Sequence, residues 1–399
     1  MNPDPKKPTQ RICGQHYQTG ELLSITCRDG LISQIDYLAD KPEDMPLVAP
    51  GLTDLQVNGF KGIDVNHEAL TVEDVDTLTQ TLWSYGVTSY LPTVITNSDD
   101  RIITALRTIH KACDRFPMVQ KSIAGVHLEG PFISPQEGPV GAHPKNHVTA
   151  PDWPSFERFM EASGQQIRLI TLSPEWPEAS DFIRRCVADG IIVSIGHTAA
   201  TPEQIREAVA AGARLSTHLG NGSHQVLPRH PNYIWEQLAL DELSACIIAD
   251  GFHLPDSVLK VVMKVKGKHT ILVSDSVGLA GCTPGSYSTH IGGDVVLTGN
   301  GKLHLAGKPN VLAGSAQPLI GGIRHLLQSQ LGSLGDVWNM ASVYPGELLD
   351  LPQKKGLSVG APADLVVFKQ TSDSLQLLET YKAGLRVYQC QQAEPSERT

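Results

Sequence analysis

The feature that most constrains the fold of this chain is a repeating unit of a short apolar run, a polar break and an amphipathic segment of about 10 to 15 residues. Such alternation is typical of parallel βα units. Eight runs in series favour a closed (β/α)8 barrel over an open doubly wound sheet, which more often has fewer strands and a Gly-rich turn after the first. The expected strands are residues 47–57, 87–95, 123–129, 167–172, 191–195, 214–218, 244–249 and 269–274.

Helical stretches lie between these runs, and two of them begin with capping signals. Thr71 and Thr201 each precede a helical pattern and can accept a hydrogen bond from the first turn. The expected helices include residues 72–85, 99–113, 179–188, 202–211 and 255–266.

Two β-rich pieces flank the predicted barrel, which spans residues 47–350. Residues 11–46 and 351–390 contain short apolar strands, and neither piece is long enough to bury a core alone. We expect the two pieces to pair into one small β-sandwich beside the barrel. Residues 1–10 are interpreted as a disordered lead-in and residues 391–399 as a polar tail.

Charge and composition exclude several classes of partner. Asp and Glu number 42 and Lys and Arg 32, a net charge of −10, and no basic cluster is present to neutralise nucleic acid phosphates. No run approaches the 18 or so apolar residues of a membrane span, and no secretory signal begins the chain. The seven scattered cysteines fit no disulfide or zinc-thiolate pattern, so we expect a cytoplasmic protein.

Ionisable residues gather where the predicted strands end, on the face where barrel enzymes build their sites. Glu129, His197 and His218 end three different strands and form a set that suits Zn²⁺ or Fe²⁺ with an open position for water. Taken singly, Glu129 could cap a turn and each histidine could be a hydrogen-bonded core residue. Asp275 ends the eighth strand, where it could act as general base and acid, or else cap the next turn.

Two further segments are candidates for substrate contacts. His143 lies in a Gly/Pro-rich loop soon after Glu129, where it could hydrogen-bond a substrate carbonyl or oxyanion, or simply be exposed. Asn221 and Gly222, with Arg229 further along, could form a small anion pocket, although Arg229 could equally be a surface charge.

Several motifs together resemble the N-acetylglucosamine-6-phosphate deacetylase family of the amidohydrolase superfamily, over essentially residues 20–390. The residues that carry the resemblance are Val126-His127-Leu128-Glu129-Gly130-Pro131-Phe132, Ser194-Ile195-Gly196-His197-Thr198, Ser216-Thr217-His218-Leu219-Gly220-Asn221, Ile248-Ala249-Asp250-Gly251-Phe252-His253 and Val273-Ser274-Asp275. The closing segment 356–368 also looks like the strand that returns to the small β domain in that superfamily.

The resemblance implies a role for each matching residue. Glu129, His197 and His218 would be the metal ligands and Asp275 the catalytic carboxylate, with His143 beside the reacting carbonyl. The positions that match substrate contacts are Ala142, His143, Asn221, Gly222, Arg229, His253, Leu312, Ala313 and Gly314. The implied reaction releases acetate from a 6-phosphorylated N-acetyl amino sugar, in a homodimer whose phosphate site, with Arg229 and His253, is completed across the interface.

Some positions depart from the family pattern. Gln56-Val57-Asn58 stands where many amidohydrolases have a His-x-His pair, so we expect one divalent ion, Zn²⁺ first and Fe²⁺ or another ion as alternatives. The turn at residues 221–225 and the segment 227–232, with His224 and His230, are unusual for the family.

These departures keep other functions open. A deacylase of a related, unphosphorylated N-acyl amino sugar is the runner-up, and a non-catalytic scaffold is the alternative outside enzymes. A cyclic-amide hydrolase would need a lysine at the end of strand four, where the chain has Thr171-Leu172-Ser173-Pro174.

Overall fold

The predicted barrel is confirmed in a computed structural model that describes residues 10–39, 44–289, 293–371 and 374–391. Eight parallel strands form one sheet, and a parallel bridge between Val57 and Ser276 joins its first strand to the segment after its last. The backbone N–H groups of Asn58 and Gly59 both donate to the Ser276 carbonyl, at 2.9 and 3.0 Å, which closes the ring. The strands are β5 (Leu52–Val57), β8 (Val87–Ile95), β9 (Val126–Glu129), β10 (Ile167–Leu172), β11 (Ile192–Ile195), β12 (Leu215–Ser216), β13 (Ser244–Ile247) and β14 (Thr270–Leu272).

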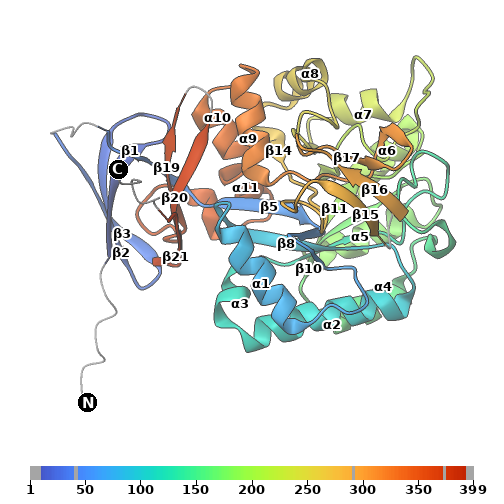
Figure 1. Cartoon of the computed structure of the whole chain (residues 1–399). Coiled ribbons are helices and arrows are strands. Elements are labelled where there is room, and N and C mark those ends of the chain that lie inside the picture. Colours follow the sequence, from blue (N-terminus) through green and yellow to red (C-terminus); the bar gives the residue numbers. More distant parts are fainter. Residues whose placement is uncertain (1–9, 40–43, 290–292, 372–373, 392–399) are drawn as a thin grey trace.

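Helices surround this sheet (Figure 1) and bury one face of each against it. Both predicted caps are confirmed, because Thr71 and Thr201 each form a capping box with the third residue of the helix. The helices are α1 (Val72–Trp83), α2 (Asp99–Arg115), α3 (Pro117–Ser122), α4 (Trp153–Ala162), α5 (Ala179–Ala188), α6 (Pro202–Ala211), α7 (Tyr233–Ala239), α8 (Asp256–Lys266), α9 (Leu319–Gln328), α10 (Leu334–Met340) and α11 (Val343–Leu348), with short 3₁₀ turns at Lys145–His147, Gly267–His269 and Pro352–Lys355.

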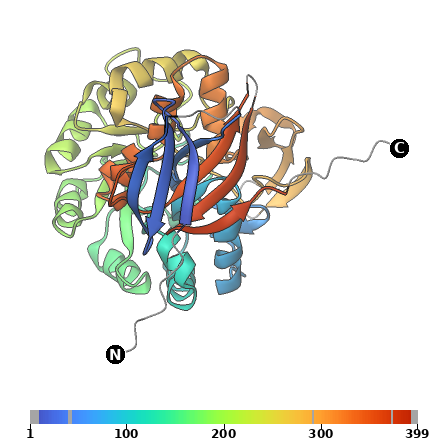
Figure 2. The ribbon, with the colours of Figure 1, turned by 90° about the vertical axis from the view of Figure 1, so that its left-hand side faces the viewer.

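The terminal segments form the predicted β-sandwich, which stands at one side of the barrel (Figures 1 and 2). Its seven-stranded sheet brings side chains from both halves into one core, among them Ile25 and Ile32 from the N-terminal half and Leu365 and Tyr381 from the C-terminal half. The strands are β1 (Gln10–His16), β2 (Leu22–Arg28), β3 (Leu31–Tyr37), β4 (Leu47–Pro50), β19 (Leu365–Gln370), β20 (Leu375–Lys382) and β21 (Leu385–Gln389).

The predicted first barrel strand, residues 47–57, is in fact two strands that belong to different sheets. β4 pairs with β1 and β19 in the sandwich, whereas β5 pairs with β8 in the barrel. Gly51 lies between them, and a Cβ there would stand 2.2 Å from Thr88 Oγ1, so only glycine lets the chain cross at this point. The predicted lead-in and tail lie outside the described residues, apart from Gln10, which begins β1, and Gln391.

A four-stranded antiparallel sheet, which the sequence pattern did not predict, follows the eighth barrel strand. It comprises β15 (Gly285–Thr289), β16 (Gly293–Leu297), β17 (Leu303–Leu305) and β18 (Lys308–Leu312). Val295, Leu297 and Leu303 form its small core. Its strands are short and half exposed, so their apolar pattern is too weak to distinguish from a loop. A two-stranded ribbon, β6 (Gly59–Phe60) and β7 (Ile63–Asp64), follows β5.

Two sequence expectations concern the protein's environment. Among the described residues, no helix combines the length and the apolar character that crossing a membrane requires. All seven cysteines are free thiols, and Cys27, Cys113, Cys186 and Cys246 are buried.

A buried ion pair fastens the sandwich to the barrel. Lys382 Nζ lies 2.7 Å from Asp364 Oδ2, and the two side chains are 3% and 4% exposed. Lys382 also reaches Ser89 Oγ on barrel strand β8 at 3.2 Å, and Asp364 Oδ1 accepts the Ala383 N–H at 2.8 Å. Gln353 donates to both Asp364 and Ser89. Removing either charge would leave the other buried without a counterion.

We therefore expect Lys382→Met to lower the free energy of unfolding by about 3–5 kcal/mol. The matched control is Lys354→Met, because Lys354 pairs with Asp350 at the surface, where the side chains are 45% and 82% exposed. An exposed pair is worth about 0–1 kcal/mol. Denaturant unfolding of both variants would measure the difference, and equal losses would contradict a structural role for the buried pair.

Candidate active site

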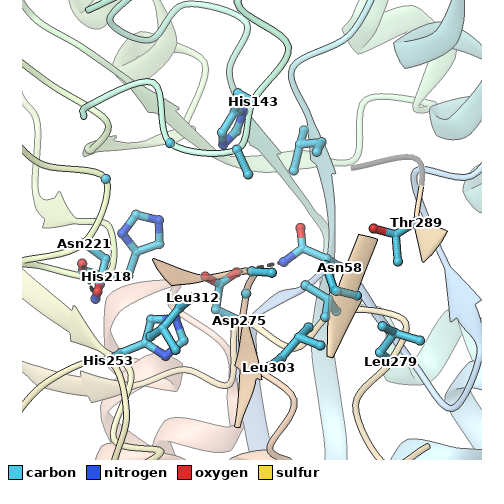
Figure 3. A pocket seen from close by; sticks show the side chains of 18 of the residues that line it. Asn58, His143, His218, Asn221, His253, Asp275, Leu279, Thr289, Leu303 and Leu312 are labelled. Carbon is cyan, nitrogen blue, oxygen red and sulfur yellow. Dashed lines mark hydrogen bonds between the residues drawn. The ribbon is translucent and has the colours of Figure 1, made fainter. Parts of the chain in front are cut away.

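A cavity of about 750 Å³ opens at the carboxyl ends of the barrel strands. Strand ends line its floor, and the added sheet β15–β18 lines one side. Figure 3 shows Asp275 and Asn58 near its middle, with His143 on one wall and His218, Asn221 and His253 grouped at one end. The cavity is therefore where barrel enzymes place their chemistry.

Glu129, His197 and His218 meet in this cavity as the strand pattern predicted. Glu129 Oε1 lies 3.2 Å from His197 Nε2 and 3.0 Å from His218 Nε2, and the two imidazole nitrogens are 3.1 Å apart. All three side chains are buried. Three ligands about 2.0–2.1 Å from a tetrahedral ion stand roughly 3.3 Å from one another, so this triangle is close to the size that one ion requires.

A hydrogen bond at Nδ1 also orients His197 so that its other ring nitrogen, Nε2, can bind a metal. Its Nδ1 lies 2.7 Å from the Pro139 carbonyl, which only accepts, so Nδ1 donates there and Nε2 is the ring nitrogen left to bind a cation. Nε2 lies 3.2 Å from Glu129 Oε1, a contact that a proton or a cation shared by the two atoms would stabilise. The donor chemistry and the spacing therefore both fit a divalent ion.

The carboxylate and the imidazoles also shift each other's protonation. Burial opposes the charge on Glu129, but hydrogen bonds from His197 and His218 outweigh it and hold the pKa of this carboxyl well below its ordinary value. Burial likewise disfavours a charged His218, yet Glu129 raises the pKa of that imidazole. The carboxylate is thus ionised, as a metal ligand must be.

His143 approaches the same group from the loop after β9. Glu129, His143 and His197 each offer a donor atom within 4.8 Å of the others, and the His143 and His197 rings are 4.4 Å apart at their centroids. The set with His218 is tighter, since its three separations are 3.0–3.2 Å. Nδ1 of His143 is 2.9 Å from Thr96 Oγ1, and burial, with the neighbouring His197, lowers the pKa of His143 to about 3. A neutral imidazole here is placed to contact a ligand at its other nitrogen.

Asp275 lies beside this group rather than within it. Asn58 Nδ2 donates to Asp275 Oδ1 at 2.7 Å (Figure 3). Burial, and then the negative charge of Glu129, raise the pKa of Asp275 to about 6. A carboxyl group with a pKa in this range can take up and return a proton near neutral pH.

The residues predicted to contact substrate fall into two groups. Ala142, Asn221, Gly222, His253, Leu312, Ala313 and Gly314 all line the cavity, as does His143. Arg229 is not among the lining residues, and it lies exposed on the loop between β12 and α7. Of the two unusual histidines, His224 is held by Tyr233, with 3.0 Å between Nδ1 and the phenol oxygen, and His230 is exposed.

Gly222 is the lining residue whose identity the backbone demands. Its φ is +55°, and a Cβ would stand 2.7 Å from His197 Nδ1. A larger residue would push against the imidazole that Pro139 orients.

Several side chains that support the site were not foreseen in these roles. Gln56 Nε2 donates to Glu129 Oε1 at 2.9 Å, and Asp250 Oδ2 lies 2.7 Å from His253 Nδ1. Asp250 Oδ1 also accepts the backbone N–H groups of Phe252 and His253, so the whole turn is fixed. The sequence offered one signal for the role of Asp250, because it lies three residues before His253 at the end of a predicted strand. No local signal could identify the Pro139 carbonyl, which arrives from a loop.

Comparisons with known proteins agree with this geometry. The sequence model of the amidohydrolase family matches residues 47–387. A bovine N-acetylglucosamine-6-phosphate deacetylase is 33% identical over 375 residues, covering 90% of this chain and 88% of the relative. An N-acetylgalactosamine-6-phosphate deacetylase from a Shewanella species is 31% identical over 388 residues, covering 94% and 93%.

Solved structures give the same result for the fold. The crystal structure of N-acetylglucosamine-6-phosphate deacetylase from Pasteurella multocida superposes with a TM-score of 0.81 at 27% sequence identity. The alignment covers 93% of this chain and 97% of that one. The similarity therefore extends over the barrel and the sandwich together.

The triangle of donor atoms predicts the metal content of the purified protein. We expect close to one tightly held divalent ion per chain by elemental analysis, because Gln56 and Asn58 replace a histidine pair that would hold a second. His197→Ala and His218→Ala should each lower metal content and turnover together, since each removes one of three protein ligands. Two stoichiometric ions, or full occupancy in both variants, would contradict this ligand set.

Proposed function

This chain belongs to the amidohydrolase family, and we propose that it hydrolyses the N-acetyl amide of a 6-phosphorylated amino sugar, N-acetylglucosamine 6-phosphate first, to acetate and the free amine. The observation that carries the proposal is the convergence of Glu129, His197 and His218 within 3.0–3.2 Å, with Asp275 beside them in one cavity. The choice of substrate is supported by the names of relatives whose alignments cover 90% and 94% of this chain.

The proposed ligands of a single divalent ion are Glu129, His197 and His218, with Zn²⁺ as the expected ion because imidazole and carboxylate suit it. Such an ion, when bound, polarises the amide carbonyl and acidifies water. The first strand supports one ion rather than two, since Gln56 and Asn58 already donate to Glu129 and Asp275.

The protein's own groups then manage the protons and the charge. Asp275 accepts a proton from the attacking water and delivers it to the amine nitrogen as the C–N bond breaks, a task that its raised pKa of about 6 favours. His143 hydrogen-bonds the carbonyl oxygen through Nε2 while Thr96 holds Nδ1. Negative charge that develops on this oxygen in the transition state strengthens that bond.

The sugar and its phosphate are assigned to the end of the cavity lined by Asn221, Gly222 and His253. Arg229 lies outside that lining, so we propose that it serves the phosphate site of a second copy in a homodimer. We further propose the cytoplasm as the compartment, and the seven free thiols support a reducing environment.

The experiment that tests this function is a panel of N-acetylated amino sugars assayed for acetate release. The panel contains the gluco and galacto epimers, each with and without a 6-phosphate. We expect the highest kcat/KM with a 6-phosphorylated sugar, and the two epimers separate the activities named for the bovine and Shewanella relatives. A metal-loaded protein that releases no acetate from any of them would overturn the proposal in favour of a non-catalytic scaffold.

The role of Asp275 leads to a specific prediction. Asp275→Asn should lower kcat by about 10²- to 10⁴-fold, because the amide keeps the shape of the side chain but cannot accept a proton. Metal content should stay near that of the wild-type protein, since Asp275 is not among the proposed ligands. Near-normal turnover in a metal-loaded variant would remove Asp275 from the mechanism.

The phosphate assignment gives another prediction. Arg229→Ala should lower kcat/KM for the phosphorylated sugar by about 10- to 100-fold, because a guanidinium–phosphate hydrogen bond is worth roughly 1.5–3 kcal/mol. Hydrolysis of the unphosphorylated analogue is the internal control and should change little. Equal losses on both sugars would show that Arg229 does not bind the phosphate.

A further inference from the structure

The cavity has a second, apolar end that the proposed sugar contacts leave unused. Val277 and Leu279 follow Asp275 along the chain, and Val295 and Leu303 belong to the added sheet β15–β18. These four residues, here called the acyl wing, all line the cavity. Figure 3 shows Leu279 and Leu303 on the other side of Asp275 from His218, Asn221 and His253.

The acyl wing is supported from behind by a packed core. Val295 and Leu303 are 1% and 2% exposed and form a cluster with Leu297 and Ala316, against which Val277 and Leu279 pack. The wing is therefore a packed apolar surface, in which Val277 and Leu279 are the more exposed part and Val295 and Leu303 support them. Water against such a surface is readily displaced by an apolar group.

Several polar side chains that also line the cavity already have partners in the protein. Asn66 donates from Nδ2 to the Thr93 carbonyl at 3.0 Å and accepts the Ile95 N–H at Oδ1 at 2.9 Å. Asn58 donates to Asp275, and Asp64 accepts the Asn66 N–H at 2.8 Å. With these groups already paired, the four apolar side chains of the wing are a surface that an occupant of this end can contact.

The geometry of an amide decides which part of the substrate reaches this end. A trans amide places the groups on its carbonyl carbon and on its nitrogen on opposite sides of the C–N bond. If the nitrogen carries the sugar toward Asn221 and His253, the acyl chain points past Asp275 toward Leu279 and Leu303. This step rests on the function proposed above, since it uses the assigned place of the sugar.

We propose that the acyl wing is a binding site for the acyl chain, and that the enzyme hydrolyses amino-sugar phosphates whose N-acyl group is longer than acetyl. The reaction keeps the same balance for each substrate. Water adds its oxygen to the carbonyl carbon, the C–N bond breaks, the nitrogen gains a proton, and a short-chain carboxylate leaves instead of acetate.

The test compares N-acetyl, N-propionyl and N-butyryl glucosamine 6-phosphate with the metal-loaded wild-type enzyme. Each added methylene that enters the acyl wing should lower KM by about fourfold, the value for burying one CH₂ group. A loss of kcat/KM of about 10- to 200-fold on going from acetyl to propionyl is the result for a pocket with no room for a methylene, and it would overturn the proposal.

Substitutions of Leu279 test the site itself. Leu279→Phe should fill the wing and lower the ratio of butyryl to acetyl kcat/KM by about 10- to 200-fold. Leu279→Ala should enlarge the wing and raise the ratio of hexanoyl to acetyl kcat/KM. Because the two substitutions predict opposite changes, a folding defect in one variant does not decide the outcome. The matched control is Val359→Phe, at a site 61% exposed in the loop before β19, which should leave all the ratios unchanged.

The outcomes separate this inference from the proposed function. Acetate release without any tolerance of propionyl or butyryl groups overturns the acyl wing and leaves the deacetylase assignment intact. If no N-acetylated amino sugar in the panel releases acetate, the deacetylase assignment is wrong, and the acyl wing, which rests on it, is overturned with it. The wing does not hold the acyl chain if neither Leu279 variant changes the kcat/KM ratios of the longer acyl substrates to the acetyl substrate. The same conclusion follows if the ratios change only for substrates with a substituent on the sugar ring.

Discussion

One oxygen atom, Oε1 of Glu129, connects four strand ends of the barrel. It accepts the Gln56 amide from β5 and lies 3.0–3.2 Å from the imidazole nitrogens that follow β11 and β12. A buried carboxylate is costly unless it is paired, and here each partner is itself held by the barrel sheet. The closure of the barrel therefore helps to place the site, because opening the ring between β5 and the segment after β14 would separate Asn58 from Asp275, the carboxylate it orients.

The backbone at these strand ends is strained in a consistent way. His197, His218 and Asp275 all have positive φ, at 49°, 25° and 46°, a region that non-glycine residues rarely occupy. Each such residue costs about 1–3 kcal/mol and persists only where its surroundings enforce it. Residues next to His218 and Asp275 supply such contacts: Thr217 Oγ1 shares a hydrogen bond with Thr171 Oγ1, and Ser274 and Ser276 donate to the carbonyls of Gln56 and Gly59. The left-handed turn ends the strand and directs the side chain into the cavity instead of continuing the ladder.

The sequence was sufficient for those parts of the protein that repeat or that end a strand. Alternating runs predicted the barrel, and Thr71 and Thr201 predicted two capped helices. Ionisable residues after the apolar runs predicted which side chains meet, because parallel strands end at one face. Contacts that arrive from outside this pattern were not predictable. The Pro139 carbonyl reaches His197 from a loop, and the sheet β15–β18 consists of short, half-exposed strands whose pattern resembles a loop.

The split of the predicted strand 47–57 has the same origin. Its residues form one continuously buried stretch from Val48 to Val57, and the pairing partners distinguish β4 from β5. Local periodicity reports burial but not the sheet in which a residue is buried. Pro50 and Gly51 were the local signs of a crossing, and the need for glycine at position 51 depends on Thr88, which lies far along the chain.

The barrel strands and the segments added to them contribute to different parts of the cavity. Every group assigned to the chemistry is on a barrel strand end or hydrogen-bonded to one, whereas the two ends of the cavity are built by the loop after β12 and by the sheet β15–β18. A change in either added element can therefore alter the sugar or the acyl group that fits without moving the donor triangle. Relatives named for two sugar epimers, each about a third identical to this chain, are what such a division would produce. On the proposed assignment, the reaction depends on the strands, and the choice of substrate depends on segments that the barrel does not need in order to close.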